Sequence, residues 1–231
     1  MSLGRNIQFL RKIYNGMTQE QLAEKMGVSR QTISKWELDI VYPEINKVID
    51  LCELFSCSMD QLIREDIDIN NEAFSDIKVK KIAGFSYVKY AVISAEPEED
   101  AKNHIKDWAY KNGIKEPEII GWDFTSVSQE QINVYHMHGY AAACILPNDY
   151  QIIDNSFEVI KQKEQKYAVI SIKDPFRAPY MLIPNAYKTL MRYIEVNRLK
   201  YMKEKDVLSC YEKEYMINGV NYIDIHIAIE N

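Results

Sequence analysis

A short run of polar side chains at helical spacing is the part of this sequence best suited to bind another molecule. The run consists of Ser29, Arg30, Gln31, Ser34 and Lys35. Arg, Gln and Lys donate hydrogen bonds that can pair with base edges and phosphates, and an α-helix of this length fits the major groove of B-DNA. The alternative is a small helical bundle whose polar face only meets water. We interpret the run as the exposed face of a DNA-binding helix.

Two short helices joined by a tight turn must position this face, and residues 17–37 have their pattern. Thr18 and Gln21 have the spacing of a capping box, which begins the first helix. Gly27 supplies a left-handed residue that ends it, and Ser29 caps the second helix. The side chains expected to face inward are Leu22, Ala23, Met26, Thr32, Ile33 and Trp36.

Residues 5–65 resemble the helix-turn-helix domain of the Cro/CI (XRE) family, whose motif reads T-Q-x-x-L-A-x-x-x-G-V-S-x-x-x-I-S-x-W-E. The resemblance implies an all-α, lambda-repressor-like domain of five helices. It also implies which side chains contact DNA: Gln19 on a phosphate, Arg30, Gln31 and Lys35 in the groove, and Ser29 and Ser34 on the DNA backbone.

Two further residues of the motif have structural consequences under this resemblance. Glu37 is expected to pair with Arg11 or Lys12 of the preceding helix. Asp39 stands where the family often has glycine, which points to a different shape for the loop before Pro43.

Charge and length limit how the protein can bind DNA. The chain has 231 residues and a net charge of −6, which suits two soluble domains. Residues 1–66 carry eight Lys and Arg against ten Asp and Glu, so a strong nonspecific polyanion binder is not expected. Affinity for an operator should come from a local basic patch, and from a homodimer that places two such faces one helical turn apart.

Several classes are disfavoured by the sequence. Arg5, Arg11 and Lys12 interrupt the N-terminal apolar run, and no apolar stretch has membrane-spanning length, so we expect a cytoplasmic protein with no membrane contact. His136 and His138 could share one face of a strand as metal ligands do, but no supporting ligand stands nearby. The four cysteines (Cys52, Cys57, Cys144 and Cys210) are expected to be reduced and mostly buried thiols. No cofactor or metal is predicted.

The second part of the chain contains an internal repeat. We expect a DNA-binding domain over 1–66, an acidic linker over 67–77 and a second domain over 78–231. The segment KYAVIS occurs at 89–94 and again at 166–171, and each copy precedes a predicted helix and two strands. We therefore predict an α+β domain of two β-α-β-β modules, about 78–150 and 156–231. Two sheets joined edge to edge, with both helices on one face, would leave a groove along a pseudo-twofold axis.

This domain resembles the GyrI-like effector-binding domain (SHS2 type) that multidrug-responsive transcription activators share with the DNA gyrase inhibitory protein. The resemblance is carried by Gly121-Trp122-Asp123, Gly139-Tyr140 and Tyr211-Glu212. It implies that the carboxylate of Glu212 lies at the bottom of a binding cleft. Strand alternation puts Glu214 on the same face, so either carboxylate could serve. Many relatives have Glu where this chain has Ala141.

The chemistry expected of this groove is the binding of a small aromatic or amphipathic effector. Tyr and Trp side chains with one carboxylate hold flat, hydrophobic and often cationic molecules by stacking, cation–π contact and charge. Most aromatic residues here are expected to be packing residues, and Glu212 could instead be a surface carboxylate paired with Lys213 or Lys203. The candidate ligand residues are Trp108, Trp122, Tyr140, Tyr187, Glu212 and Glu214.

Three functions remain open for the second domain. The first is ligand sensing in a transcription regulator that is not an enzyme. The second is a hydrolase of small electrophiles with Glu212 as general base, which the DNA-binding motif and Ala141 disfavour. The third is a module that captures a protein partner in the same groove. We favour the first.

Overall fold

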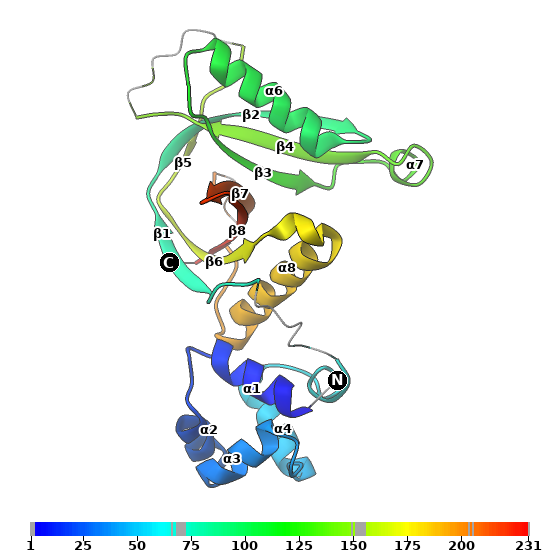
Figure 1. The fold of residues 1–231 in the computed structure, drawn as a ribbon, viewed down its shortest axis with the longest axis vertical. Coiled ribbons are helices and arrows are strands. Elements are labelled where there is room, and N and C mark those ends of the chain that lie inside the picture. The colour runs from blue at the N-terminus through cyan, green and yellow to red at the C-terminus, as the bar shows by residue number, and fades with distance from the viewer. Residues whose placement is uncertain are drawn as a thin grey trace. The chain divides into compact units, whose positions relative to one another are not determined.

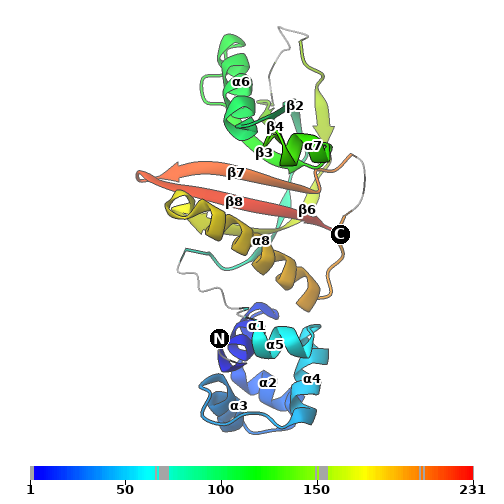
Figure 2. The same cartoon turned by 90° about the vertical axis from the view of Figure 1, so that its right-hand side faces the viewer.

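The computed structural model describes residues 3–65, 67, 73–148, 150, 156–202, 204 and 206–230. It divides into two compact units, which are described separately (Figures 1 and 2). The helical unit is Met1–Ile77 with Arg177–Lys200, and the sheet unit is Lys78–Phe176 with Tyr201–Asn231. This division differs from the expected boundaries by placing Arg177–Lys200 with the helices. Residues 68–72 of the expected linker, residues 151–155 between the expected modules, and Lys203 lie outside the described residues.

The helical unit has the five expected helices at its N-terminal end. They are α1 (Leu3–Ile13), α2 (Gln19–Met26), α3 (Arg30–Glu37), α4 (Ile45–Phe55) and α5 (Met59–Arg64). The capping box at Thr18 and Gln21 is present, Gly27 is left-handed with φ of 64°, and Ser29 accepts a hydrogen bond from the Thr32 N–H. Local sequence therefore determines where both motif helices begin and where the first ends.

The core of the helical unit joins α1 to the two motif helices. The largest fully buried side chains of this core are Ile7, Leu10, Leu22, Ile33, Leu51, Phe55 and Leu62. The first turn of α1 lies directly on the end of α3: a Cβ atom at Gly4 would lie 2.3 Å from the Trp36 carbonyl oxygen. Only glycine allows this approach.

A sixth helix, α8 (Pro179–Val196), ends within the helical unit. It begins at Pro179 rather than near Pro184, which lies inside the helix. Val196 is fully buried in the core of the helical unit. The Asn197 side-chain amide donates to the carbonyl oxygens of Ile13 at 3.0 Å and Tyr193 at 2.8 Å. The end of α8 thus satisfies a carbonyl in the last turn of α1.

The sheet unit contains one eight-stranded sheet in the described chain, and all its paired strands are antiparallel. Its strands are β1 (Lys78–Ile82), β2 (Phe85–Ser94), β3 (Glu118–Phe124), β4 (His138–Ile145), β5 (Ile160–Gln162), β6 (Gln165–Lys173), β7 (Cys210–Ile217) and β8 (Val220–Ile229). The helices α6 (Pro97–Lys111) and α7 (Gln129–Asn133) belong to the same unit. The strand order is β1-β6-β8-β7-β3-β4-β2-β5.

This order confirms the duplicated fold and adds a feature that the sequence did not predict. The halves meet at β3 and β7, where Gly121 pairs with Glu212. However, β1 precedes the first half and pairs with β6 of the second, whereas β5 precedes the second half and pairs with β2 of the first. The two connections touch, because a Cβ at Gly84 would lie 2.9 Å from the Gln162 carbonyl oxygen. Each half therefore receives its outer strand from the other.

The identical KYAVIS segments are not structural equivalents. Across the sheet, Tyr90 lies in one row with Gly121, Glu212 and Ile170. Tyr90 is thus equivalent to Ile170 and not to Tyr167, which faces the opposite side. Because side chains alternate along a strand, a three-residue shift moves the repeated letters to the other face.

Helix α6 covers one face of the first half, across β2, β4 and β3 (Figure 1). It packs on this face in a core that includes Ile105, Trp108, Tyr140 and Cys144. The opposite face has its own core, which includes Tyr87, Ile120, Tyr167, Val169 and Tyr211. Among the described residues, no helix is both long enough and apolar enough to cross a membrane.

Candidate nucleic-acid interface and ligand cleft

The exposed face of α3 contains the donors that the sequence predicts. Arg30, Gln31 and Lys35 are exposed, while Ile33 and Trp36 on the other side of the helix are buried. Ser29 is also exposed and Ser34 is half-buried, as the same helical phase requires. The packing therefore holds α3 so that its two cations and one amide project together.

A buried ion pair connects α3 to α1, and a hydrogen bond connects the same glutamate to α2. Glu37 is 5% exposed and accepts hydrogen bonds from Arg11 Nε to Oε1 at 2.5 Å and Arg11 Nη2 to Oε2 at 3.1 Å. Of the two expected partners, Arg11 and Lys12, the structure pairs Glu37 with Arg11. Gln19 Nε2 donates to Glu37 Oε2 at 2.9 Å, so this amide keeps one N–H for the phosphate contact that remains a prediction.

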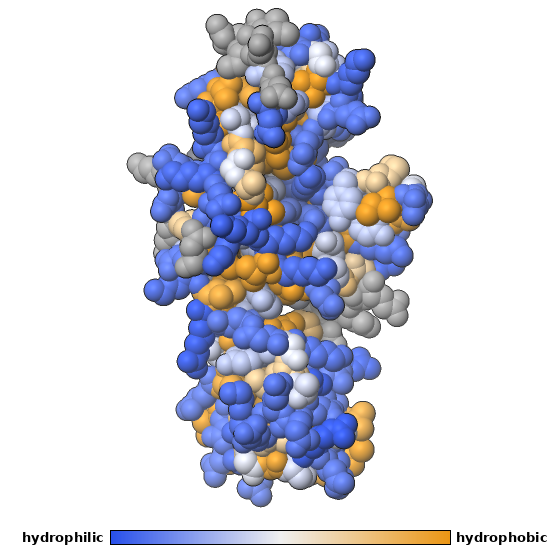
Figure 3. All heavy atoms as spheres, turned by 90° about the vertical axis from the view of Figure 1, so that its left-hand side faces the viewer, coloured by the Kyte–Doolittle hydropathy of each residue, from blue (hydrophilic) through white to orange (hydrophobic). Residues whose placement is uncertain are grey.

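The loop after α3 exposes apolar side chains. Asp39 has φ of 54°, the left-handed conformation that glycine favours, and its Oδ1 accepts from the Gly4 N–H at 2.8 Å. Leu38, Ile40 and Tyr42 are 65%, 64% and 68% exposed. Ile45 and Ile49, four residues apart on α4, are exposed as well. On the face that Figure 3 shows, by contrast, hydrophilic side chains cover most of the helical unit.

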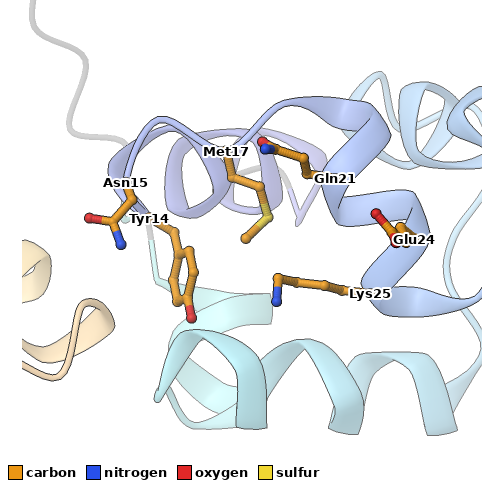
Figure 4. Close-up of a pocket in the computed structure, with 6 residues that line it drawn as sticks. All are labelled: Tyr14, Asn15, Met17, Gln21, Glu24 and Lys25. Atoms are coloured by element: carbon orange, nitrogen blue, oxygen red, sulfur yellow. The ribbon is translucent and has the colours of Figure 1, made fainter.

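A shallow hollow of about 430 Å³ lies between the end of α1 and α2, and Figure 4 shows its lining. It is formed by Tyr14, Asn15, Met17, Gln21, Glu24 and Lys25. Glu24 and Lys25, its charged side chains, are exposed to solvent. Exposed charges are screened by water, so this hollow has little to hold a ligand.

A second cavity, of about 120 Å³, lies where the two halves of the sheet meet, and we refer to it as the cleft. It is lined by Lys102, Lys106, Pro117, Ile119, Ile120, Gly121, Glu212 and Glu214. The structure thus brings both predicted carboxylates to one cavity. The expected alternative partner Lys213 instead pairs with Glu118 at 2.5 Å.

An ammonium group already occupies the edge of the cleft. Lys102 Nζ donates to Glu214 Oε1 and, at 2.5 Å, to Glu98 Oε1, and it lies 5.5 Å from the centroid of the Tyr140 ring. Burial lowers the pKa of Lys102, but Glu214 and Glu98 outweigh that effect and the net shift is upward. Lys102 is therefore a stable cation at this position.

Tyr140 lies next to Gly121, one of the residues that line the cleft. It is 3% exposed, and its hydroxyl has no hydrogen-bond partner in the described part of the chain. A Cβ at Gly121, which lines the cleft, would lie 2.2 Å from this hydroxyl oxygen. Burial raises the pKa of Tyr140, and Glu212, Glu98 and Glu214 raise it further. The Tyr140 hydroxyl therefore stays protonated, with carboxylate side chains around it. Burial also raises the pKa of Asp123, which pairs with Tyr140 across β3 and β4.

The remaining candidate ligand residues lie elsewhere. Trp108 is 7% exposed and packs edge-on against Phe157, with ring centroids 5.6 Å apart. Trp122 packs against Tyr87 on the opposite face of the sheet. Tyr187 is on α8, in the helical unit. Of the predicted set, Glu212 and Glu214 line the cleft and Tyr140 lies beside Gly121, while Trp122 packs in the core on the opposite face of the sheet.

Sequence reasoning missed Glu98, Lys102 and Asp123. Glu98 and Lys102 are four residues apart on α6, a spacing that predicts an ion pair but cannot tell which strand the pair faces. Among the described residues, no group of three or more His, Cys, Asp or Glu side chains could hold a metal ion.

A buried histidine lies on the face opposite α6. His226 is 4% exposed and stacks on Tyr211, with ring centroids 4.3 Å apart. Its Nδ1 has no hydrogen-bond partner among the residues that the structure describes. Burial lowers the pKa of His226 to about 4, against an opposing effect of Asp224. The ring is neutral at ordinary pH.

The fold and these two sites define a helix-turn-helix DNA-binding domain joined to a duplicated antiparallel-sheet domain. The family described as Helix-turn-helix (HTH_3) matches residues 7–62, so the N-terminal helices are an XRE-type domain. The match covers the whole of the candidate DNA interface.

Two relatives and one solved structure are similar to this chain. The HTH-type transcriptional activator BcrR of Enterococcus faecalis is 36% identical over 88 residues, which are 38% of this chain and 43% of BcrR. The HTH-type transcriptional regulator ImmR of Bacillus subtilis (strain 168) is 29% identical over 82 residues, 36% of this chain and 63% of ImmR. The chain thus matches less than two thirds of either relative.

The solved structure is EcmrR in its DNA complex. It is 13% identical and covers 97% of this chain and 81% of EcmrR, with a TM-score of 0.50. This likeness is one of fold.

Proposed function

We propose that the protein is a ligand-responsive transcription regulator. The helical unit binds an operator with α3 in the major groove, and the sheet unit binds a small aromatic or amphipathic molecule in the cleft. The observation that carries the proposal is the joint projection of Arg30, Gln31 and Lys35 from a helix-turn-helix whose other side is buried. The similarity to BcrR, a transcriptional activator, and to ImmR, a transcriptional regulator, supports it.

The DNA contacts follow from the chemistry of each side chain. Arg30 and Gln31 have the donors to read base edges, and Lys35 suits a phosphate. Ser29 and Ser34 contact the DNA backbone, and Gln19 binds a phosphate through its free N–H and the start of α2. Because net charge is negative, binding depends on this local face rather than on the field of the whole protein.

The regulator acts as a homodimer in this proposal. Two copies of α3 one helical turn apart match a palindromic operator. The exposure of Leu38, Ile40, Tyr42, Ile45 and Ile49 supports a protein contact in the helical unit, since exposed apolar side chains are frequent in such surfaces. Ligand occupancy would bias the placement of the two recognition helices and thereby the operator affinity.

The DNA proposal is tested by removing the two cations of α3. We expect Arg30→Ala with Lys35→Ala to weaken binding to a DNA fragment selected by the wild-type protein by about 100-fold, because a base contact and a phosphate contact are lost. Gel-shift titration measures the affinity, and its dependence on salt should become shallower.

The matched control is Lys25→Ala with Arg64→Ala, which removes the same charge from exposed positions on α2 and α5. Equal losses in the two double variants, or unchanged affinity in the first, would show that α3 does not read the DNA.

A further inference from the structure

We propose that Cys52 and Cys57 are a modification site, at which the two thiols close to a reversible disulfide. Cys57 reacts first with a small-molecule disulfide, the oxidised form of a low-molecular-weight thiol, and Cys52 then completes the bond within the chain. In the structure both cysteines are free thiols. The site belongs to the helical unit and does not depend on a ligand in the cleft.

The end of α4 brings the two thiols together. Ser56 is left-handed, with φ of 51°, and the Cys57 N–H donates to the Cys52 carbonyl oxygen at 3.0 Å. This is the Schellman end of a helix, in which two side chains five residues apart come into contact. The contact is usually apolar, but here both side chains are thiols. They share a side-chain hydrogen bond, so the two sulfur atoms are already adjacent.

The backbone holds both thiols in this arrangement. Cys52 lies in the last turn of α4, and Cys57 directly precedes Ser58, the N-cap of α5. Ser58 and Gln61 form a complete capping box, with hydrogen bonds of 2.9 and 3.1 Å. A disulfide needs two Cβ atoms that face each other at short distance. A pair of thiols that is fixed between two capped helix ends and already hydrogen-bonded needs little further movement to form one.

Exposure gives the two thiols different roles. Cys52 is 9% exposed in the core of the helical unit, whereas Cys57 is half-buried and packs against this core. A small-molecule disulfide therefore reaches Cys57 first, and Cys52 reacts only through Cys57. The other two cysteines, Cys144 on β4 and Cys210 on β7, belong to the sheet unit, where β3 separates their strands.

The exchange has two steps that conserve atoms and electrons. First, Cys57 Sγ loses its proton and attacks one sulfur of the small disulfide, so that a mixed disulfide forms and one small thiol leaves with the proton. Second, Cys52 Sγ loses its proton and attacks Cys57 Sγ, so that the protein disulfide forms and the second small thiol leaves. Two electrons and two protons thus pass from the protein to the small disulfide.

Burial makes the first step slow at neutral pH. It raises the pKa of Cys57 to about 12, and Cys52 adds to this effect while Arg192 of α8 opposes it. Burial also raises the pKa of Cys52. Very little of Cys57 is therefore thiolate at neutral pH, and the rate of exchange depends on that fraction. The pair stays reduced during brief exposure to an oxidant and closes when oxidation is sustained.

The test exposes the full-length protein to oxidised glutathione at about pH 8.5, where thiolates are more abundant. Acid stops the exchange, and peptide mass spectrometry locates each modification. We expect wild type to lose two hydrogen atoms by joining Cys52 to Cys57. Cys52→Ala should instead keep one glutathionyl group on Cys57, because the second thiol is missing. Cys57→Ala should leave Cys52 unmodified, because Cys52 is buried.

Two further measurements separate a prearranged pair from accidental oxidation. Cys210→Ala removes a half-buried thiol of the sheet unit and should close its disulfide at the wild-type rate. Oxidised wild type should unfold at a midpoint about 5 °C above that of reduced wild type, because a bond in native geometry restricts only the unfolded chain. Dithiothreitol should reverse this shift. Thermal unfolding before oxidation shows that each alanine variant is folded.

Several results would overturn the inference. A wild-type protein that keeps a glutathionyl group on Cys57 would show that Cys52 does not complete the bond. A wild-type protein that stays reduced after prolonged incubation would show that the oxidant does not reach Cys57. Modification of Cys52 in Cys57→Ala would contradict the assigned order. A disulfide that lowers the unfolding midpoint would show that the end of α4 is not arranged for it.

Discussion

The two halves of the duplicated fold contain equivalent helices, α6 and α8, that have different roles. Both end on an asparagine whose side-chain amide donates to the carbonyl four residues earlier, Asn112 to Trp108 at 2.9 Å and Asn197 to Tyr193 at 2.8 Å. Asn197 also donates to Ile13 of the helical unit. Helix α6 stays with its own strands and forms one wall of the cleft, whereas the end of α8 is part of the DNA-binding unit.

The ends of α6 and α8 differ at the position directly before each capping asparagine. Directly before each capping asparagine, α6 has the exposed Lys111 and α8 has the fully buried Val196. The buried Val196 and the Asn197 donor thus place the end of α8 in the core of the helical unit. In this way α6 lines the cleft between the two halves, and the end of α8 packs among the N-terminal helices.

The largest expected effect comes from exchanging these two positions. Val196→Lys places a charge in the core of the helical unit and should lower its free energy of unfolding by about 3 kcal/mol or more. Lys111→Val changes an exposed position and should stay within about 0.5 kcal/mol of wild type. Denaturant unfolding with hydrogen exchange of α1 measures both. Similar effects of the two changes would show that the helix ends do not differ as described.

The strands of the two halves also differ, in the core opposite α6. His226 of β8 occupies the place that Ala143 has in β4, since their partners Val169 and Lys89 are equivalent. Burial lowers the pKa of His226 to about 4, so the folded protein resists protonation of this imidazole ring. The free energy of unfolding therefore has its full value above about pH 6.5. It falls by up to about 3 kcal/mol as the pH drops towards 4.

We expect His226→Phe to remove this dependence on pH while keeping a ring against Tyr211. The measurement is the difference in unfolding free energy between wild type and variant from pH 7.5 to 4. A difference that stays constant over this range would mean that His226 does not titrate as its burial requires.

The smallest effect separates the two capping asparagines. Asn197→Ala loses the hydrogen bond to the Ile13 carbonyl as well as the capping bond to Tyr193. It should destabilise the helical unit by about 1 kcal/mol. Asn112→Ala should affect only the sheet unit. Hydrogen exchange of the last turn of α1 reports the difference, and equal protection in the two variants would argue against a link through Asn197.

The DNA-binding helices were predictable because their determinants are local. Capping residues at Thr18 and Ser29, the left-handed Gly27 and the spacing of buried side chains specify two helices and the turn between them. The family resemblance predicted that Glu37 pairs with Arg11 or Lys12, and only the structure shows that the partner is Arg11. The candidate ligand site was predicted only in part: Glu212, Glu214 and Tyr140 converge, but Lys102 comes from a helix whose orientation no pattern specified.

By itself, the sequence determined the helix-turn-helix, the donors on its exposed face and the presence of a duplicated sheet. Tertiary structure alone decided the exchange of β1 and β5, the three-residue shift that makes Tyr90 equivalent to Ile170, and the face on which Trp122 lies. It also decided that Lys102 occupies the cleft and that α8 ends among other helices. The reason is physical: caps and periodicity act within a few residues, whereas strand register and ion pairing depend on contacts between distant segments.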